Sequence, residues 1–124
     1  MSEATEQAAF FQWLQVQINL GYPQAEALAH LFAIPNGELR KPSIAARLKL
    51  QGVRPGVPDL FLPVPRGTYH GMWIEMKSGR NRPTDEQREW LGYLARQHYK
   101  TVVAYGWEEA RDRLMEYLEL DHAD

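Results

Sequence analysis

The sequence predicts an α/β fold in which a mixed central β-sheet is flanked by helices. Apolar residues recur at helical spacing near both ends of the chain, whereas the apolar runs in the middle are short or alternate, as strands do. A helix-length segment separates one middle strand from a later strand, so these two strands can pair in parallel through a crossover. The expected order is one helix, three strands, a helix, a strand and a helix.

The first helix is expected to run from Glu3 to about Leu20. Ser2 or Thr5 can cap its N-terminus, and Gly21 with the following Tyr-Pro pair ends it. Its apolar stripe consists of Phe10, Phe11, Leu14 and Ile18. This stripe is the face that should pack against the sheet.

The next segments are short and less regular. Residues 24–33 are alanine-rich, and they form either a helix or a segment that runs into a strand around residues 31–34. The Pro-Asn-Gly sequence at 35–37 signals a turn. Residues 43–50 are expected to form a short basic helix that stops at Gly52.

Two strands are expected in the middle of the chain. Val57–Leu62 is a short apolar run with a single acid, Asp59. Met72–Lys77 alternates, so Trp73 and Glu75 share one face with the terminal lysine. The Pro-Arg-Gly-Thr sequence at 65–68 can join the two runs as a hairpin.

The C-terminal part predicts a helix, a strand and a helix. Thr84 should begin the first of these helices, which extends to about His98 with Gln87 as a capping-box partner. Its buried stripe is expected to be Trp90, Leu91 and Leu94. The β-branched segment Lys100–Tyr105 follows as a strand, and residues 108–118 form the last amphipathic helix.

Length and composition indicate one folded domain spanning 1–124. The chain has 124 residues, of which 44% are hydrophobic and 24% charged, close to the average of globular proteins. No apolar run approaches the roughly 20 residues that span a bilayer, and the N-terminus lacks a signal-peptide pattern. We therefore expect a cytoplasmic protein with no membrane association.

The chain contains no cysteine. This excludes disulfides, a thiol nucleophile, iron–sulfur clusters and thiolate zinc sites. Any metal must be held by oxygen or imidazole ligands, so Mg²⁺ or Mn²⁺ is the natural candidate.

Charge is distributed unevenly along the chain. The formal net charge is −2, yet residues 36–82 contain nine basic residues and three acidic ones, while the C-terminal stretch 116–124 is acidic. A basic middle with an acidic end can hold a polyanion in one place and repel it elsewhere. Solvated surface charge would give the same pattern, so charge alone does not decide between the two.

Two carboxylates and an ammonium group are expected to converge in the predicted hairpin. Asp59, in a Pro-Asp pair, lies sixteen residues before Glu75, and Glu75 shares a strand face with Lys77. Acids within apolar strands are costly to bury without a partner. Their oxygens, with a backbone carbonyl such as that of Met76 and with waters, suit an octahedral Mg²⁺ ion. Such an ion can activate a bound water, and Lys77 can stabilise charge that builds up on a phosphate.

This pattern resembles the PD-(D/E)XK nuclease superfamily, and its surroundings resemble the VRR-NUC branch of that superfamily. The matching stretches are SEATEQ, FAIPNGELR, LKLQGVRPGVPDLFLP, HGMWIEMKSG, PTDEQREWL and YGWEEARDRLMEYL. They cover nearly the whole chain, which leaves no room for a second domain. Small chains of this kind are typical of phages and bacteria, and the same module ends larger DNA-repair nucleases.

The resemblance implies a restriction-endonuclease-like core and a DNA endonuclease that uses Mg²⁺ or Mn²⁺. The implied products have 5′-phosphate ends, and the implied substrates include branched DNA such as flaps and four-way (Holliday) junctions. The family also places an acid of the first helix near the metal. Glu3 and Glu6 compete for this role, and a helical projection puts Glu3 nearer the centre of the apolar stripe. A glutamine beside the catalytic lysine is also implied, and Gln87 fits it.

Several residues are candidates for DNA contact. Asn36 and Arg40 lie in a stretch that resembles the substrate-facing loop of the family, although Asn-Gly is also an ordinary turn. Other basic side chains could contact the DNA backbone, which positions a protein without reading sequence. They are Lys41, Arg47, Lys49, Arg80 and Arg82.

The same residues bear on two alternative functions and on one assembly. A catalytically inactive nucleic-acid-binding protein on the same fold is disfavoured because the acids and the lysine are all present. A hydrolase of small phosphoesters is disfavoured by the basic middle and by the absence of a phosphate-binding glycine loop. A homodimer would match the two-fold symmetry of a four-way junction, with Trp107 or Tyr117 as the apolar contact.

Overall fold

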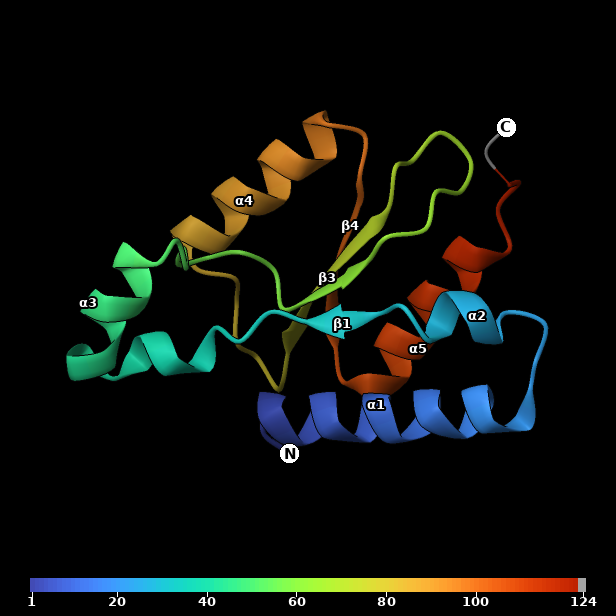
Figure 1. The fold of residues 1–124 in the computed structure, drawn as a ribbon, viewed down its shortest axis with the longest axis horizontal. Helices are drawn as coiled ribbons and strands as arrows, with labels where there is room; N and C mark the ends of the chain where they lie inside the picture. The colour runs from blue at the N-terminus through green and yellow to red at the C-terminus, as the bar shows by residue number, and fades with distance from the viewer. Residues whose placement is uncertain (123–124) are drawn as a thin grey trace.

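The sheet lies between two layers of helices (Figure 1). The computed structural model describes residues 1–122, without the side chain of Glu38. The helices are α1 (Glu3–Leu20), α2 (Ala25–Leu28), the 3-10 helix η1 (Gly37–Arg40), α3 (Pro42–Leu50), α4 (Asp85–Arg96) and α5 (Trp107–Leu118). In Figure 1, α4 lies on one side of the sheet, and α1, α2 and α5 lie on the other.

The sheet has four strands in the order β1-β2-β3-β4. They are β1 (Phe32–Ala33), β2 (Leu60–Leu62), β3 (Met72–Lys77) and β4 (Lys100–Tyr105). The first three strands are antiparallel neighbours, whereas β3 and β4 pair in parallel through the α4 crossover. The predicted mixed sheet flanked by helices is therefore confirmed.

Caps define the predicted helix boundaries. Ser2 Oγ accepts a hydrogen bond from the Thr5 N–H at 3.1 Å, and Gly21 ends α1 in the left-handed conformation with φ 67°. Thr84 caps α4 as expected. The open alternative at residues 24–33 resolves into both forms, because α2 ends at Leu28 and β1 begins at Phe32.

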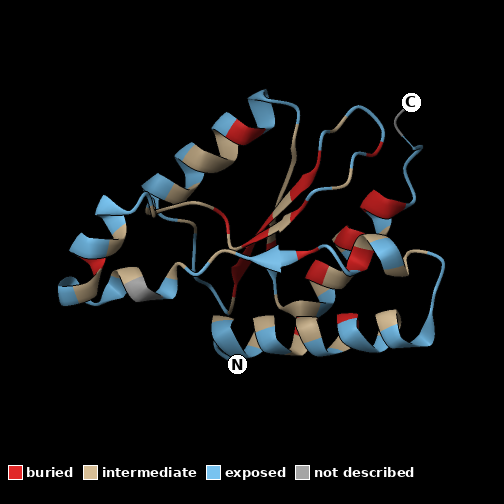
Figure 2. Cartoon of the chain, viewed as in Figure 1, coloured by how far each residue is buried: buried red, intermediate tan, exposed pale blue. Residues whose placement is uncertain are grey.

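One core joins the sheet to α1, α2 and α5. Alternate residues of β3, Met72, Ile74 and Met76, are buried on this side with Phe10 of α1 and Leu114 of α5. Figure 2 shows this burial concentrated in the central strands and the inner faces of those helices. The opposite face of β3, with Trp73, Glu75 and Lys77, is turned toward the α4 side.

The predicted buried stripe of α4 is wrong in part. Only Leu94 is buried, whereas Trp90 and Leu91 are half-buried. The reason is that α4 packs mainly on β4 and leaves the β1–β2 half of this sheet face without a covering helix.

The predicted apolar dimer contact at Tyr117 is also wrong. Tyr117 is 2% exposed, and its hydroxyl donates a hydrogen bond to the Val64 carbonyl at 2.7 Å. Trp107 is half-buried against the core, and the Arg111 guanidinium carbon lies 5.1 Å from its ring centroid. A homodimer and a contact at Trp107 stay predictions, whereas Tyr117 is too buried to take part.

Among residues 1–122, no helix is long and apolar enough to cross a membrane. Residues 123–124, the end of the predicted acidic stretch and of the predicted domain, lie outside the described residues.

Candidate active site

The register of β2 and β3 brings Asp59 opposite Glu75. Leu60 pairs with Ile74 in antiparallel register, so the residue before Leu60 faces the residue after Ile74. Asp59 Oδ2 accepts a hydrogen bond from the Met76 N–H at 2.7 Å. This bond fixes one oxygen of the carboxylate against the strand that carries Glu75.

Lys77 lies between two carboxylates. Its Nζ is 3.6 Å from Glu75 Oε2 and 3.4 Å from Glu3 Oε1. Lys77 is 6% exposed and Glu75 is 1% exposed, so both groups are largely removed from water. Buried charges of this kind persist only when partners hold them.

Glu75 is the most perturbed acid of the site. Burial, and then the negative charge and hydrogen bonding of Asp59, raise its pKa from 4.5 to about 8, although Lys77 acts in the opposite direction. Glu75 Oε1 is buried without a hydrogen-bond partner among the described residues. Two neighbouring carboxylates with one unbonded buried oxygen favour either a proton or a cation at this point.

The oxygen donors fit a hard divalent cation. The Lys77 carbonyl accepts a hydrogen bond from the Gly106 N–H on the β4 side, whereas the Met76 N–H points to Asp59. Because the N–H and C=O of one strand residue point to the same side, the Met76 carbonyl also faces Asp59. Within the described part of the chain, no three His, Cys, Asp or Glu side chains could hold a metal by themselves. Mg²⁺ needs only one or two carboxylates, because it keeps several waters.

These residues open into a cleft of about 610 Å³. Its walls come from the start of α1, the β1–η1 segment, the loop before β2, the end of β3 and the start of α4. The cleft residues predicted from sequence are Glu3, Asn36, Arg40, Asp59, Glu75, Lys77 and Gln87. They come from five separate stretches of the chain, so the fold brings them together.

Glu6 does not belong to this cleft. Its Oε2 accepts a hydrogen bond from the Trp107 N–H at 3.3 Å, at the N-terminus of α5. Gly106, with φ 94°, lets the backbone approach, since a Cβ there would lie 3.0 Å from Glu6 Oε2. The prediction of Glu6 as a metal ligand is wrong, because this carboxylate caps α5 instead. Glu3 lies in the cleft, where it pairs with Lys77.

Gln87 occupies its predicted capping position and also lines the cleft. Its Oε1 accepts a hydrogen bond from the Thr84 N–H at 2.9 Å, and its own N–H donates to Thr84 Oγ1 at 3.2 Å, which completes a capping box. The same side chain lines the cleft that contains Lys77. Its amide oxygen is therefore committed to the cap.

Substitutions of Gln87 separate these two roles. Gln87→Glu keeps a capping acceptor but replaces the amide donor in the cleft, so we expect an unchanged melting temperature and slower DNA cleavage. Gln87→Ala removes the cap and should cost about 1 kcal/mol of unfolding free energy. Thermal melting and a cleavage assay on both variants measure this. A Gln87→Glu variant that cuts at the wild-type rate would leave Gln87 with the capping role alone.

The other predicted DNA contacts are distributed around the cleft. Arg40 is exposed at its wall, whereas the Asn36 amide donates to the Val57 carbonyl at 2.7 Å and so ties two walls together. The remaining predicted contacts are exposed and lie outside the cleft: Lys41, Arg47 and Lys49 at α3, and Arg80 and Arg82 between β3 and α4. Arg66 belongs to a different region, since it is 7% exposed and binds the Pro65 carbonyl.

The loop before β2 contributes a residue that the sequence analysis did not single out. Gly56 has φ 90°, and a Cβ there would lie 2.8 Å from the backbone carbon of Glu86 in α4. Only glycine allows this approach, which sets the wall of the cleft that leads to Asp59. The Pro-Gly pair at 55–56 is the signal that could have marked it.

Comparisons with known proteins agree with the fold. The domain model of the VRR-NUC family matches residues 1–108. A solved structure described as a VRR_NUC domain protein is similar to this chain, with 29% sequence identity and a TM-score of 0.83. The alignment covers 100% of this chain and 93% of the other chain. No curated protein matches the sequence. The chain therefore belongs to the VRR-NUC domain family, a family of nuclease domains within the PD-(D/E)XK superfamily.

Proposed function

We propose that the chain is a DNA endonuclease that depends on Mg²⁺ or Mn²⁺. The observation that carries the proposal is the convergence of Asp59, Glu75 and Lys77 at the base of one cleft. Asp59, Glu75 and the Met76 carbonyl are the groups that would hold the cation. When bound, the cation supplies charge that polarises the scissile phosphate and activates water.

The side chains of the chain itself account for the remaining requirements. Lys77 presents an ammonium donor where negative charge develops on the phosphate, and preorganised donors of this kind contribute strongly to catalysis. Glu3 orients that ammonium from the opposite side, at 3.4 Å. Because two acidic side chains contact Lys77, its side chain has few alternative conformations. The ammonium group is therefore already positioned before DNA binds.

Basic residues around the cleft would position the DNA backbone. Arg40 lines the cleft, and Arg80 and Arg82 lie in the segment that links Lys77 to Thr84, two further lining residues. Guanidinium groups bind phosphates without reading sequence. We extend the proposal to branched DNA bound by a homodimer, whose two-fold axis would match a four-way junction.

The proposal predicts cleavage that requires a divalent cation. Purified protein should cut labelled linear, flapped or four-way-junction DNA with Mg²⁺ or Mn²⁺ and should leave all of them intact in EDTA. Undiminished cleavage in EDTA would overturn the proposal. Binding without cleavage in either metal would identify an inactive nucleic-acid-binding protein instead. Light scattering on the same sample measures the oligomeric state.

A further inference from the structure

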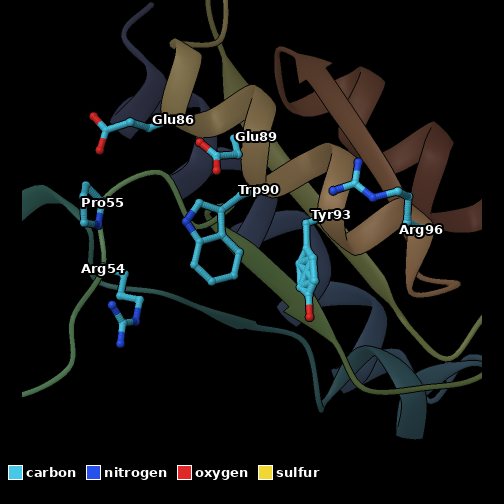
Figure 3. A pocket seen from close by; sticks show the side chains of 7 residues that line it. All are labelled: Arg54, Pro55, Glu86, Glu89, Trp90, Tyr93 and Arg96. Carbon is cyan, nitrogen blue, oxygen red and sulfur yellow. The ribbon is translucent and has the colours of Figure 1, made fainter.

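A second cavity, of about 480 Å³, lies against α4 (Figure 3). Trp90, Tyr93 and Arg96 of α4 line one side of it, and Arg54 and Pro55 line the other. We call this cavity the α4 groove. Figure 3 shows the Trp90 and Tyr93 rings projecting from the helix toward the side where Arg54 lies.

The α4 groove presents ring faces together with cationic groups. The Trp90 and Tyr93 rings are 6.5 Å apart at 68°, and the Arg96 guanidinium carbon lies 6.0 Å from the Tyr93 centroid. Tyr93 is 46% exposed, and Arg54 and Arg96 are exposed. Aromatic rings with neighbouring arginines are the chemistry that binds unpaired nucleotides, through base stacking and phosphate contacts.

The groove adjoins the catalytic cleft. Pro55 lines both cavities, and Gly56 packs against the backbone of Glu86 between them. A strand of DNA with its scissile phosphate near Asp59 therefore has the groove as its next concave surface along this loop.

The carboxylates of Glu86 and Glu89 determine whether the groove favours the base or the phosphate of a nucleotide. Glu86 and Glu89 also line it and are exposed. They would repel a continuous run of phosphates, which argues against a duplex backbone in the groove. Carboxylates instead accept hydrogen bonds from exocyclic amino groups, which cytosine, adenine and guanine present and thymine lacks.

We propose that the α4 groove binds one unpaired nucleotide of the DNA substrate, with its base against Trp90 and Tyr93 and its phosphate beside Arg54 or Arg96. The groove prefers a base with an exocyclic amino group, which is cytosine, adenine or guanine, to thymine because of Glu86 and Glu89. The inference rests on the proposed nuclease function and adds to it a specific place for single-stranded DNA next to the cut.

Binding is measured by fluorescence anisotropy in EDTA, where the proposed nuclease does not cut. The probes are labelled duplexes with a short single-stranded branch in which one position is cytosine, thymine or an abasic spacer, scanned along the branch. At one position we expect the abasic probe to bind about 5- to 100-fold more weakly than the cytosine probe, as loss of a stacked base implies. The thymine probe should lie between them.

Variants assign the effect to the groove. Tyr93→Ser should bring the cytosine and abasic probes close to equal affinity, while Tyr93→Phe retains the difference. Tyr22→Ser is the matched control, since Tyr22 is 52% exposed and lies in the turn after α1, away from both cavities. It should leave the difference unchanged.

Three results would overturn the inference. They are equal affinity for all probes at every position, no binding of any probe, and full discrimination by Tyr93→Ser. A cleavage assay in Mn²⁺ distinguishes failure of the groove proposal from failure of the proposed nuclease function. Cutting without base discrimination rejects the groove alone, whereas base discrimination without cutting in any metal rejects the nuclease proposal and keeps the groove.

Discussion

Lys77→Met is expected to reduce the rate of DNA cleavage by about 100-fold or more while the chain stays folded and binds DNA. Losing one preorganised donor to developing charge costs roughly 10²- to 10³-fold in other hydrolytic sites. Methionine nearly matches the length of lysine, so the 6% exposed position keeps its packing without the ammonium. Single-turnover cleavage at saturating Mn²⁺ measures the effect.

Asp59→Asn should have a similar effect for a different reason. Asparagine keeps an oxygen that can accept the Met76 N–H, so the loop stays in place while the negative charge of the cation site is lost. Lys100→Met is the matched control for both variants, because Lys100 is half-buried in β4 and stacks 5.6 Å from the Tyr69 centroid at the opposite end of the sheet. If Asp59→Asn or Lys77→Met cut like Lys100→Met, the active site would have to lie elsewhere.

Glu75→Gln is expected to abolish cleavage and yet to stabilise the metal-free chain at pH 8. The folded chain holds the Glu75 proton up to a pKa of about 8, whereas an unfolded chain releases it near 4.5. Between these values the folded state binds more protons, so its stability falls as the pH rises. Glutamine carries no ionisable proton and removes this loss.

Thermal melting in EDTA at pH 5 and pH 8 measures the effect. The melting temperature of the wild-type chain should be lower at pH 8 than at pH 5, and that of Glu75→Gln should fall by less. Mg²⁺ or Mn²⁺ should restore the melting temperature of the wild-type chain at pH 8. Glu119→Gln, at an exposed position after α5, is the control and should follow the wild type. A Glu75→Gln variant with the wild-type pH dependence would show that Glu75 is not the group that titrates.

Local patterns predicted β3, β4 and α1 well, whereas β2 begins at Leu60 and not at the predicted Val57, so Asp59 precedes the strand. The bounds of β3 and β4 follow from alternation and β-branched residues, and those of α1 follow from Ser2 and Gly21. The juxtaposition of Asp59 and Glu75 was also predictable, because the buried apolar residues of both strands restrict the register in which they pair.

Long-range contacts could not be predicted in the same way. Periodicity marks the apolar face of α4, but Trp90 remains half-buried because the helix covers only part of the sheet. The charge count includes Arg66 among the basic residues of the middle segment 36–82. Folding buries this side chain within the connection between β2 and β3, outside the cleft. The role of Glu6 depends on a partner 101 residues away, at Trp107.

The contacts of Glu3 and Glu6 at the start of α1 also restrict the number of residues in the first turns of this helix. Glu3 pairs with Lys77 and Glu6 caps α5, while Phe10 anchors the same helix in the core. One residue inserted between Glu6 and Phe10 would turn both acids by about 100° around the helix axis. Substitutions in this stretch alter one contact at a time, but an insertion or deletion would displace both carboxylates together. Designed variants of the chain must therefore preserve the number of residues between Glu3, Glu6 and Phe10, even where they change the residues between them.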